Sequence, residues 1–371
     1  MNIVLYNDTR NVDNNPGCKA TINGLINLLN LSYPNSDIEC MPYGIFSSYF
    51  THISSYRPKG GLAKIKSLFF RQFFSLEEEE LDFYFYRNFL KKVKKLIEIQ
   101  EFKTAMFDKE LVVINMEGTV HHNTLQGITL IGIAYAAHLS GKKVFLLNGS
   151  IQKMSKQLLK NTFNRIDYIA VREIISHTYL NELNIKNNLA LDCAFLSKIT
   201  ENQSNIFTSK GKRCLYTTGV ILAYSQQHNI ENPIEIIENH VSSLKNKGYE
   251  VFFLKIEENE SLLEPALQAL DVSIIDMNDY DWNMIGSILA EFELIVSGRY
   301  HIIIFCIMMN IPFIPIESNT WKIEGLFKTL NKDIEIQKLT NSLDDIMPYQ
   351  FLFTDLPKEI QKLPYCNIPN N

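Results

Sequence analysis

Short apolar runs alternate with amphipathic segments along most of the chain, and this alternation limits the fold more than any other feature. In the first half, apolar runs cover residues 3–6, 111–115, 144–148, 168–171 and 189–191, and helical patterns cover 125–139, 155–163 and 175–183. Strands that are almost wholly apolar and are separated by helices are typical of a parallel sheet with helices on both faces. We therefore expect a doubly wound, Rossmann-like α/β domain in this half.

The same alternation begins again in the second half. Apolar runs at 220–224, 251–254, 272–275, 294–296 and 313–316 alternate with helical patterns at 233–247, 261–270, 281–292 and 302–309. Between the two series, residues 201–213 (ENQSNIFTSKGKR) are polar and show no periodicity. The sequence thus predicts a first domain over 1–200, a linker over 201–213, a second Rossmann-like domain over 214–331 and a C-terminal segment, 332–371, that crosses back to the first domain. Two such domains would face a central cleft at the carboxyl ends of their sheets, where this fold class binds ligands.

The composition fits two globular domains and argues against several classes of protein. A chain of 371 residues suits two domains at ~150 residues each, and a net charge of -5 argues against a nucleic-acid-binding protein. Six cysteines without a CxxC pair argue against a disulfide scaffold or a structural zinc site. The first strand has no basic leader before it, and the longest apolar run, 302–309, is far shorter than the ~20 residues of a membrane span. We therefore expect a cytoplasmic protein.

One segment departs from the alternation. Residues 57–100 suggest a helical insertion in the first domain, and its part 59–74 mixes lysines and an arginine with phenylalanines. We favour a helix that packs its aromatic face against the first domain, because aromatic stripes usually build cores. The alternative is a helix that lies on the inner face of an anionic membrane.

Polar residues follow several of the predicted strands, and the first such cluster comes after strand 3–6. It contains Asn15, Gly17 and Lys19, and a helical pattern at 22–29 follows it. A glycine-bearing turn that opens a helix presents backbone N–H groups to an anion. An ordinary connecting loop has the same appearance in sequence, so this cluster alone predicts little.

The second cluster follows strand 111–115 and contains Glu117, His121 and His122. A buried carboxylate or imidazole requires partners, and histidine exchanges a proton near neutral pH. We favour a functional role for these residues over the alternative, a helix N-terminal turn with exposed histidines.

A third cluster, Arg172 and Glu173, follows strand 168–171. The planar guanidinium of Arg172 would suit a carboxylate or phosphate in the cleft, and a surface ion pair between the two residues is the alternative. Asp192 follows the next strand, where we favour a helix cap over a role in orienting a group in the cleft.

The fourth cluster is the most informative and lies between an apolar strand and an apolar helix. It contains Ser297, Gly298, Arg299 and His301. Burial of an arginine and a histidine between such elements would cost several kcal/mol unless something pairs with them, and a glycine there allows the backbone to approach a ligand. We favour ligand binding over the alternative, a structural arginine whose partners lie within the chain. Downstream, the polar stretch 317–322 should border the same cleft.

In their order along the chain, these clusters resemble the motifs of the polysaccharide pyruvyltransferase family. The resemblance rests on Asn15-Pro16-Gly17, Glu117-Gly118-Thr119-Val120-His121, Val171-Arg172-Glu173, Asp192 with Ala194-Phe195, Ser297-Gly298-Arg299-Tyr300-His301, Pro312, and the tail Ser318-Asn319, Lys322-Ile323 and Gly325-Leu326. It spans most of the chain, and Ser-Gly-Arg-x-His is its most specific part. It implies two domains with a fold like that of GT-B glycosyltransferases.

The usual reaction of that family moves a pyruvyl group from phosphoenolpyruvate to two hydroxyls of a sugar, which forms a cyclic ketal. The resemblance implies such a transferase of bacterial surface polysaccharide biosynthesis, acting on exopolysaccharide or capsule. It implies that Arg172 and Arg299 bind the donor, that His301 is the catalytic histidine and a general acid, and that His121 is a second histidine of the cleft. Two arginines and two histidines suit an anionic donor without a metal or another cofactor. The partner would be a saccharide acceptor, which could be polyprenyl-linked.

The full set of candidate residues follows from the clusters and the resemblance together. Catalysis is assigned to His301, His121 and Glu117, donor binding to Arg172, Arg299, Ser297, Gly298, Asn15, Gly17 and Lys19, and the acceptor side or cleft to His122, Asp192, Ser318, Asn319 and Lys322.

The first loop departs from the family pattern, and this keeps a second function open. Many members have Asn-x-Gly-Asp there, whereas Cys18 follows Gly17 in this chain. The alternative is a GT-B-type glycosyltransferase that uses a nucleotide-activated sugar, with arginine and lysine holding the diphosphate and Glu117 or His121 handling the acceptor hydroxyl. A noncatalytic carbohydrate-binding protein is disfavoured, because a neutral sugar does not require two arginines at strand ends.

Overall fold

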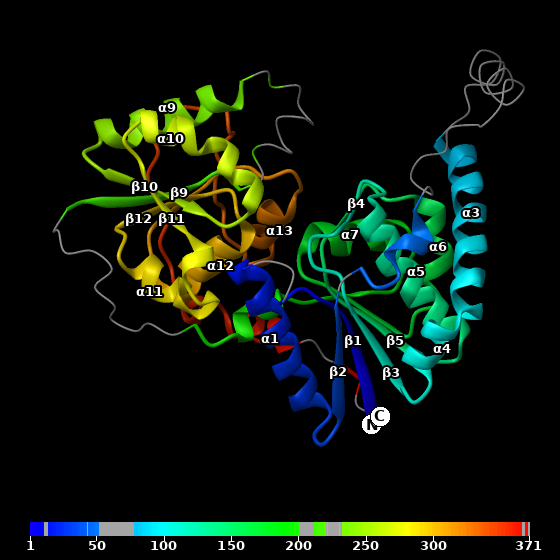
Figure 1. Ribbon diagram of the computed structural model, residues 1–371. Helices are drawn as coiled ribbons and strands as arrows, with labels where there is room; N and C mark the ends of the chain where they lie inside the picture. The colour runs from blue at the N-terminus through cyan, green and yellow to red at the C-terminus, as the bar shows by residue number, and fades with distance from the viewer. Residues whose placement is uncertain are drawn as a thin grey trace, which may run out of the picture. The chain divides into compact units, whose positions relative to one another are not determined.

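The computed structural model describes residues 1–10, 14–42, 44–51, 78–199, 211–219, 221, 230, 232–365 and 368–369. The chain forms two compact units (Figure 1). Unit 1 contains Met1–Asp8, Ser32–Ala190 and Cys366–Asn371, and unit 2 contains Thr9–Leu31 and Leu191–Tyr365. Each unit has its own parallel sheet, so the expected α/β class is confirmed.

The sheet of unit 1 has six strands in the order β2-β1-β3-β5-β7-β8. All neighbouring strands in it are parallel. The strands are β1 (Asn2–Asp8), β2 (Asp37–Pro42), β3 (Leu111–Asn115), β5 (Lys143–Gly149), β7 (Tyr168–Val171) and β8 (Asn188–Leu189). Every residue of β3 and β7 is buried, which explains why these strands are continuous apolar runs in the sequence.

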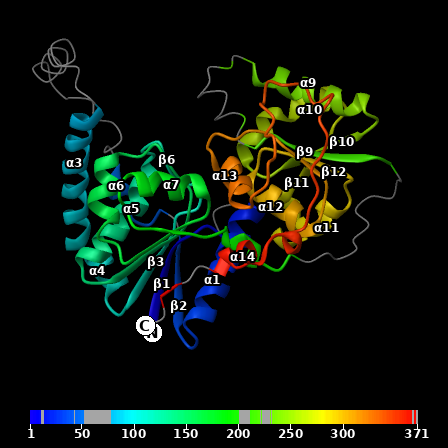
Figure 2. The same cartoon turned by 180° about the vertical axis from the view of Figure 1, so that it is seen from behind.

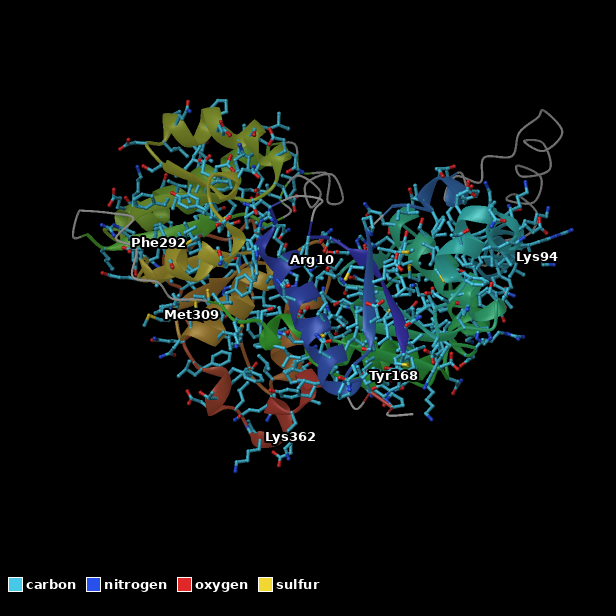
Figure 3. The ribbon with its side chains drawn as sticks, turned by 60° about the horizontal axis from the view of Figure 1, so that its bottom comes forward. Arg10, Lys94, Tyr168, Phe292, Met309 and Lys362 are labelled. Atoms are coloured by element: carbon cyan, nitrogen blue, oxygen red, sulfur yellow. The ribbon has the colours of Figure 1, made fainter. Side chains whose placement is uncertain are left out.

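The helices of unit 1 cover this sheet. They are α3 (Glu78–Glu98), α4 (Gln100–Met106), α5 (Leu125–Leu139), α6 (Lys156–Phe163) and α7 (Ile174–Glu182). The short strands β4 (Val120–His121) and β6 (Ile151–Gln152) pair beside them. Helix α5 packs against both the sheet and α3, and most of its side chains are buried for that reason. Helix α3 is amphipathic: Val93 and Leu96 are buried, whereas Lys94 is exposed and projects outward (Figure 3).

The sheet of unit 2 has five parallel strands in the order β11-β10-β9-β12-β13. They are β9 (Arg213–Thr217), β10 (Glu250–Lys255), β11 (Ser273–Asp276), β12 (Leu294–Ser297) and β13 (Phe313–Pro315). Helices α9 (Pro233–Asn246) and α10 (Glu264–Ala269) bury their apolar residues on one face. Helices α11 (Ile285–Ala290), α12 (Tyr300–Met309) and α13 (Lys322–Thr329) do so on the other face (Figure 2). The short α14 (Lys358–Gln361) precedes the C-terminus.

The first helix after β1, α1 (Pro16–Ser32), has almost its whole length in unit 2. Residues 1–200 were expected to form one domain, but Thr9–Leu31 and the residues from Leu191 onward group with the second unit. The reason is local packing, because Ala20 of α1 lies in the same apolar cluster as Leu191, Ala194 and Ile302. In the C-terminal segment, residues up to Tyr365 belong to unit 2 and Cys366–Asn371 to unit 1. The Tyr33 hydroxyl of unit 1 donates a hydrogen bond to the Pro369 carbonyl (2.6 Å).

Several expected elements differ from the observed ones. Arg213, the last residue of the expected linker, is the first residue of β9, and it is buried with the strand that follows. The strand expected at 220–224 falls almost entirely outside the described residues. Strand β2 was not expected, because its apolar residues alternate with charged ones at the edge of the sheet.

The expected insertion over 57–100 lies only partly within the described residues, which begin again at 78 with α3. The proposed membrane-contact segment 59–74 lies wholly outside them. Across the ranges that the structure describes, no helix combines the length and the apolar character that a bilayer crossing requires.

Candidate functional site

His301 is on the first turn of α12 and belongs to a three-residue network within unit 2. Its Nε2 lies 3.1 Å from Thr21 Oγ1 and 3.4 Å from Asp192 Oδ2. Asp192 is fully buried, and its Oδ1 accepts hydrogen bonds from the Ala194 N–H (2.7 Å) and the Thr21 hydroxyl (3.3 Å). A buried carboxylate beside an imidazole holds the ring in one orientation. Asp192 thus caps a short helix and also contacts His301.

Gly17 lies directly against this imidazole. A Cβ atom at Gly17 would be 2.2 Å from His301 Nδ1, closer than real Cβ contacts allow. The Gly17 N–H donates to Asn15 Oδ1 (3.0 Å), which shapes the turn at the start of α1. The first and fourth sequence clusters therefore meet in the structure, and glycine is required at position 17 because the ring occupies the space of a side chain.

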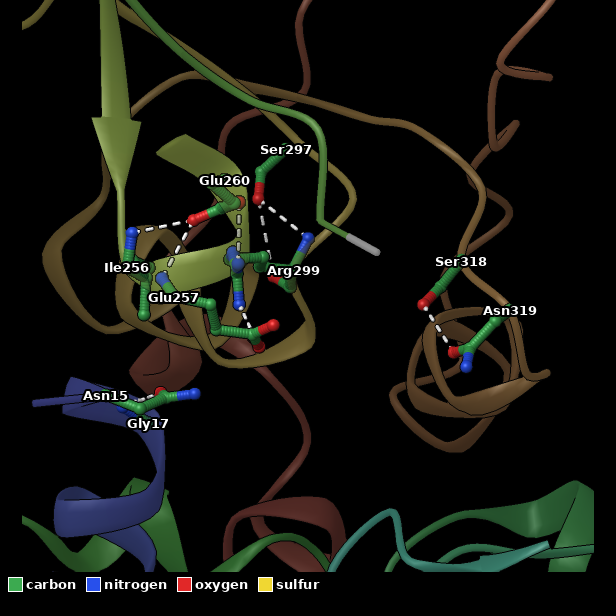
Figure 4. A network of polar contacts seen from close by, with 9 residues as sticks. All are labelled: Asn15, Gly17, Ile256, Glu257, Glu260, Ser297, Arg299, Ser318 and Asn319. Atoms are coloured by element: carbon green, nitrogen blue, oxygen red, sulfur yellow. Dashed lines mark hydrogen bonds and ion pairs between the residues drawn. The ribbon is translucent and has the colours of Figure 1, made fainter. Parts of the chain in front are cut away.

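Arg299 is held between two carboxylates (Figure 4). Its Nη1 donates to Glu257 Oε1 (3.0 Å) and its Nη2 to Glu260 Oε1 (2.7 Å). Burial alone would lower the pKa of Arg299, but Glu260 and Glu257 raise it above its ordinary value, so the guanidinium is charged. Its Nε is buried and has no hydrogen-bond partner among the residues that the structure describes. One guanidinium N–H therefore remains available to an acceptor that the chain itself does not supply.

Ser297 and Gly298 form the turn between β12 and Arg299. The buried Ser297 hydroxyl accepts a hydrogen bond from the Arg299 N–H (2.9 Å). A Cβ at Gly298 would lie 3.1 Å from the Thr218 carbonyl oxygen and 3.2 Å from that of Glu317. Gly298 therefore allows the loops after β9, β12 and β13 to approach one another through their backbones.

Lys19 is anchored at the start of α1. Its Nζ donates to Asn14 Oδ1 (2.7 Å), and Asn14 Nδ2 in turn donates to the carbonyl oxygens of Met277 and Tyr280, at 2.7 Å for Tyr280. These contacts fix the N-terminal turn of α1 to the loop after β11.

The loop after β13 contains the remaining candidates of unit 2. Ser318 is buried and its hydroxyl donates to Asn319 Oδ1 (3.4 Å), while Lys322 is half-buried at the first position of α13. Figure 4 shows Ser318 and Asn319 to one side of the Arg299 cluster. Glu317 begins this loop, and it lines a pocket of about 370 Å³ with Glu324, Lys328, Lys332 and Lys338 among others.

In unit 1, Glu117 lies in a buried polar cluster after β3. Its Oε1 accepts a hydrogen bond from Asn115 Nδ2 (2.7 Å), and Asn7 Nδ2 donates to the Asn115 carbonyl oxygen (2.7 Å). Asn7 and Glu117 have positive φ values of 72° and 43°. The side-chain oxygens of Asn7 and Asn115 are buried and, within the described part of the chain, have no hydrogen-bond partner. The cluster is thus rich in hydrogen-bond acceptors.

The two histidines after β3 lie side by side. The Nδ1 atoms of His121 and His122 are 3.0 Å apart, so one of the two must carry the proton of a shared hydrogen bond. Partial burial and then the nearby Lys153 lower the pKa of His122. His122 is the more exposed of the two residues.

Arg172 and Glu173 are both buried within unit 1, so the alternative of a surface ion pair is wrong. Arg172 is 1% exposed, and its Nε donates to Ser150 Oγ (2.9 Å). Glu173 is the N-cap of α7 and accepts hydrogen bonds from the N–H groups of Ile175 (2.7 Å) and Ser176 (3.0 Å). Burial raises the pKa of Glu173, and these hydrogen bonds oppose that rise. The role of Arg172 in donor binding stays a prediction.

The structure brings together the first and fourth clusters and Asp192 in unit 2, and it places the second and third clusters in unit 1. Sequence reasoning missed Thr21, Glu257 and Glu260. Glu257 and Glu260 follow strand β10 in the run Glu-Glu-Asn-Glu, and their position after an apolar strand was the available signal. Among the described residues, no three His, Cys, Asp or Glu side chains are grouped to hold a metal ion. That the reaction needs no metal or cofactor stays an expectation.

The comparison with known protein families gives a match over most of the chain. The model of the family described as polysaccharide pyruvyl transferase matches residues 46–320. The matched range contains Glu117, Arg172, Asp192, Arg299 and His301, while the α1 turn precedes it. A comparison with curated proteins finds no match to this sequence.

Solved structures with a similar fold include several UDP-GlcNAc 2-epimerases. The enzyme from Methanocaldococcus jannaschii aligns with a TM-score of 0.55 and 12% identity, over 99% of this chain and 96% of its own. The enzyme from Neisseria meningitidis, bound to UDP-GlcNAc, aligns with a TM-score of 0.55 and 13% identity, over 100% and 95%. The S. aureus MnaA–UDP structure aligns with a TM-score of 0.51 and 12% identity, over 91% and 85%. These epimerases have the GT-B fold, so the expected GT-B-like fold is confirmed, and at such low identity the likeness concerns the fold alone.

Proposed function

The chain belongs to the polysaccharide pyruvyl transferase family, and from this premise we propose that it transfers a pyruvyl group from phosphoenolpyruvate to two hydroxyls of a sugar. The observation that carries the proposal is the turn between β12 and α12, which presents Arg299 and His301 two positions apart. Arg299 retains a buried Nε–H without a partner in the described chain, and His301 is held by Asp192 and Thr21. A cation beside an oriented proton donor suits an anionic enol substrate.

The proposed reaction assigns a distinct role to each group. His301 donates a proton to the methylene carbon of phosphoenolpyruvate, which makes the adjacent C2 electrophilic. The two sugar hydroxyls add to C2, the C2–O bond to phosphate breaks, and inorganic phosphate leaves. One hydroxyl proton restores His301 and the other leaves with phosphate, so atoms and charge balance. Arg299 stabilises the negative charge of the donor throughout.

The proposed acceptor is a saccharide of a surface polysaccharide pathway, either free or polyprenyl-linked. In unit 1, Glu117 and the oxygens of Asn7 and Asn115 support acceptor binding, because buried hydrogen-bond acceptors match sugar hydroxyls. We assign Glu117 as the base that takes the hydroxyl proton that then leaves with phosphate.

Thermal unfolding with candidate donors tests the proposal. A ligand at 100 times its Kd should stabilise the protein by ~2.7 kcal/mol, a shift that a melting curve detects. We expect a shift with phosphoenolpyruvate that is lost in Arg299→Gln, and phosphate release from phosphoenolpyruvate once a saccharide acceptor is added. A shift with UDP, GDP or CMP and none with phosphoenolpyruvate would instead select the glycosyltransferase alternative. Phosphate release that survives in both His301→Ala and His301→Gln would refute the role of His301.

A further inference from the structure

Arg299 of unit 2 forms ion pairs with two carboxylates, although a single carboxylate would neutralise its charge. Arg299 is bonded to Glu257 and Glu260 at the same time. With one positive and two negative groups, this cluster has a formal charge of -1. A strongly anionic donor that approached Arg299 would therefore meet a negatively charged cluster, unless one carboxylate withdraws.

The two carboxylates are held very differently. Glu260 has a side chain that is 4% exposed, and its Oε2 accepts the N–H groups of Ile256 (2.7 Å) and Glu257 (2.9 Å) while its Oε1 binds Arg299. Removal of Glu260 from this position would leave backbone donors and a guanidinium without their acceptor, which makes its displacement unfavourable. Glu260 is therefore held firmly in the turn after β10 by its hydrogen bonds and ion pair.

The side chain of Glu257 is 33% exposed, whereas that of Arg299 is 10% exposed. When this pair opens, water can solvate the Glu257 carboxylate, while Glu260 still compensates the charge of the buried Arg299. Glu257 can therefore leave Arg299 at a lower cost than Glu260 can.

The unpaired Nε of Arg299 also points to an absent ligand. A buried guanidinium N–H without an acceptor is unfavourable, and no described residue supplies one for Nε. An anion that replaced Glu257 would satisfy the charge of Arg299 and could place an oxygen at Nε as well. Phosphate and carboxylate groups have the several oxygens that such a contact needs.

We propose that Glu257 is an exchangeable counter-ion of Arg299, displaced by the anionic group of the donor, and that Glu260 is the residue that positions Arg299 to receive it. This inference rests on the proposed role of Arg299 in donor binding. It assigns Glu257 a function in specificity: ligands that are neutral or weakly charged do not displace it, whereas a polyanion such as phosphoenolpyruvate does.

Binding of phosphoenolpyruvate and of inorganic phosphate to the full chain tests this inference by calorimetry at low ionic strength. Glu257→Gln removes the competing charge and should tighten binding of both anions about tenfold. The matched control is Glu258→Gln, which makes the same charge change on an exposed neighbour and should leave both affinities unchanged. The gain should disappear in the double variant Glu257→Gln/Arg299→Gln, because the anion binds through Arg299. Glu260→Gln should weaken binding, and its melting temperature separates this effect from unfolding.

Three outcomes would overturn the inference. It fails if Glu257→Gln binds both anions no better than the unchanged protein, if Glu258→Gln tightens them equally, or if neither anion binds any variant. Failure of the proposed function looks different: Glu257→Gln would tighten phosphate and UDP binding while phosphoenolpyruvate yields no transfer. If the protein transfers the pyruvyl group from phosphoenolpyruvate but Glu257→Gln does not change the affinity for either anion, the inference about Glu257 is wrong and the proposed function stands.

Discussion

Replacement of Gly17 by alanine tests whether the position of His301 matters. The new Cβ would lie 2.2 Å from His301 Nδ1, and ordinary contact begins at 3.4 Å, so the ring would have to move by about 1 Å. That movement disrupts the 3.1 Å contact to Thr21 and the 3.4 Å contact to Asp192. Because a misplacement of ~1 Å at a reacting group can reduce the rate ~10²-fold, we expect a loss of kcat of that size.

The assay for Gly17→Ala is phosphate release from phosphoenolpyruvate with a saccharide acceptor. Stability should fall by only ~1–3 kcal/mol, the usual effect of an added methyl group in a packed site. Gly211→Ala is the matched control in the same unit, since a Cβ there would meet only Glu250 Oε2, at 3.6 Å. A folded Gly17→Ala protein with the kcat of the unchanged enzyme would refute the reasoning, because His301 would then tolerate a displaced ring.

Three further predictions concern single residues. Asp192→Asn keeps an oxygen that accepts the Ala194 N–H but removes the negative charge beside His301. We therefore expect kcat to fall about 10²-fold while the melting temperature changes little. An unchanged kcat would exclude a role of Asp192 in positioning His301. Glu173→Ala removes the N-cap of α7 and should destabilise the protein by ~1–2 kcal/mol in urea unfolding, and a change below a few tenths would contradict its assignment as a cap. His240 is buried between the Tyr216 hydroxyl and the Asn341 carbonyl oxygen, and burial lowers its pKa. The unfolded chain therefore binds this proton more readily, so stability should fall as pH decreases below ~6.5, and His240→Gln should flatten that slope in a series of melting curves.

The strand and helix pattern could be predicted well where burial is complete. Strand β3 and helix α5 appear in the sequence with their observed bounds, because every residue of β3 and most of α5 face the core. Strand β9 was missed, since its run Arg-Cys-Leu-Tyr-Thr is short and follows lysines and a glycine. Periodicity also cannot show that α1 and β1 belong to different units, because the packing of α1 depends on contacts between Ala20 and residues more than 150 positions away.

The candidate site could be predicted at the level of clusters rather than partners. The sequence identified Arg299 and His301 as buried polar residues that need partners, and the structure supplies Glu257 and Glu260 for the first, Thr21 and Asp192 for the second. Of these partners, only Asp192 was singled out beforehand. The others are ordinary residues in sequence, since a threonine in a helix or an acidic run after a strand is common on any protein surface.

Because residues 9–31 belong to unit 2, helix α1 cannot complete its packing during synthesis until most of the chain has been made. The helix that contains Gly17 and Thr21 is synthesised early, directly after β1, whereas its partners Asp192 and His301 are synthesised far later. The apolar face of α1 therefore stays exposed to solvent, or is covered by a chaperone, until the second half of the polypeptide has been made. A fragment that starts at Leu191 would lack this helix altogether, so the second half of the gene alone should yield a protein that aggregates, and separately supplied residues 9–31 should restore its solubility.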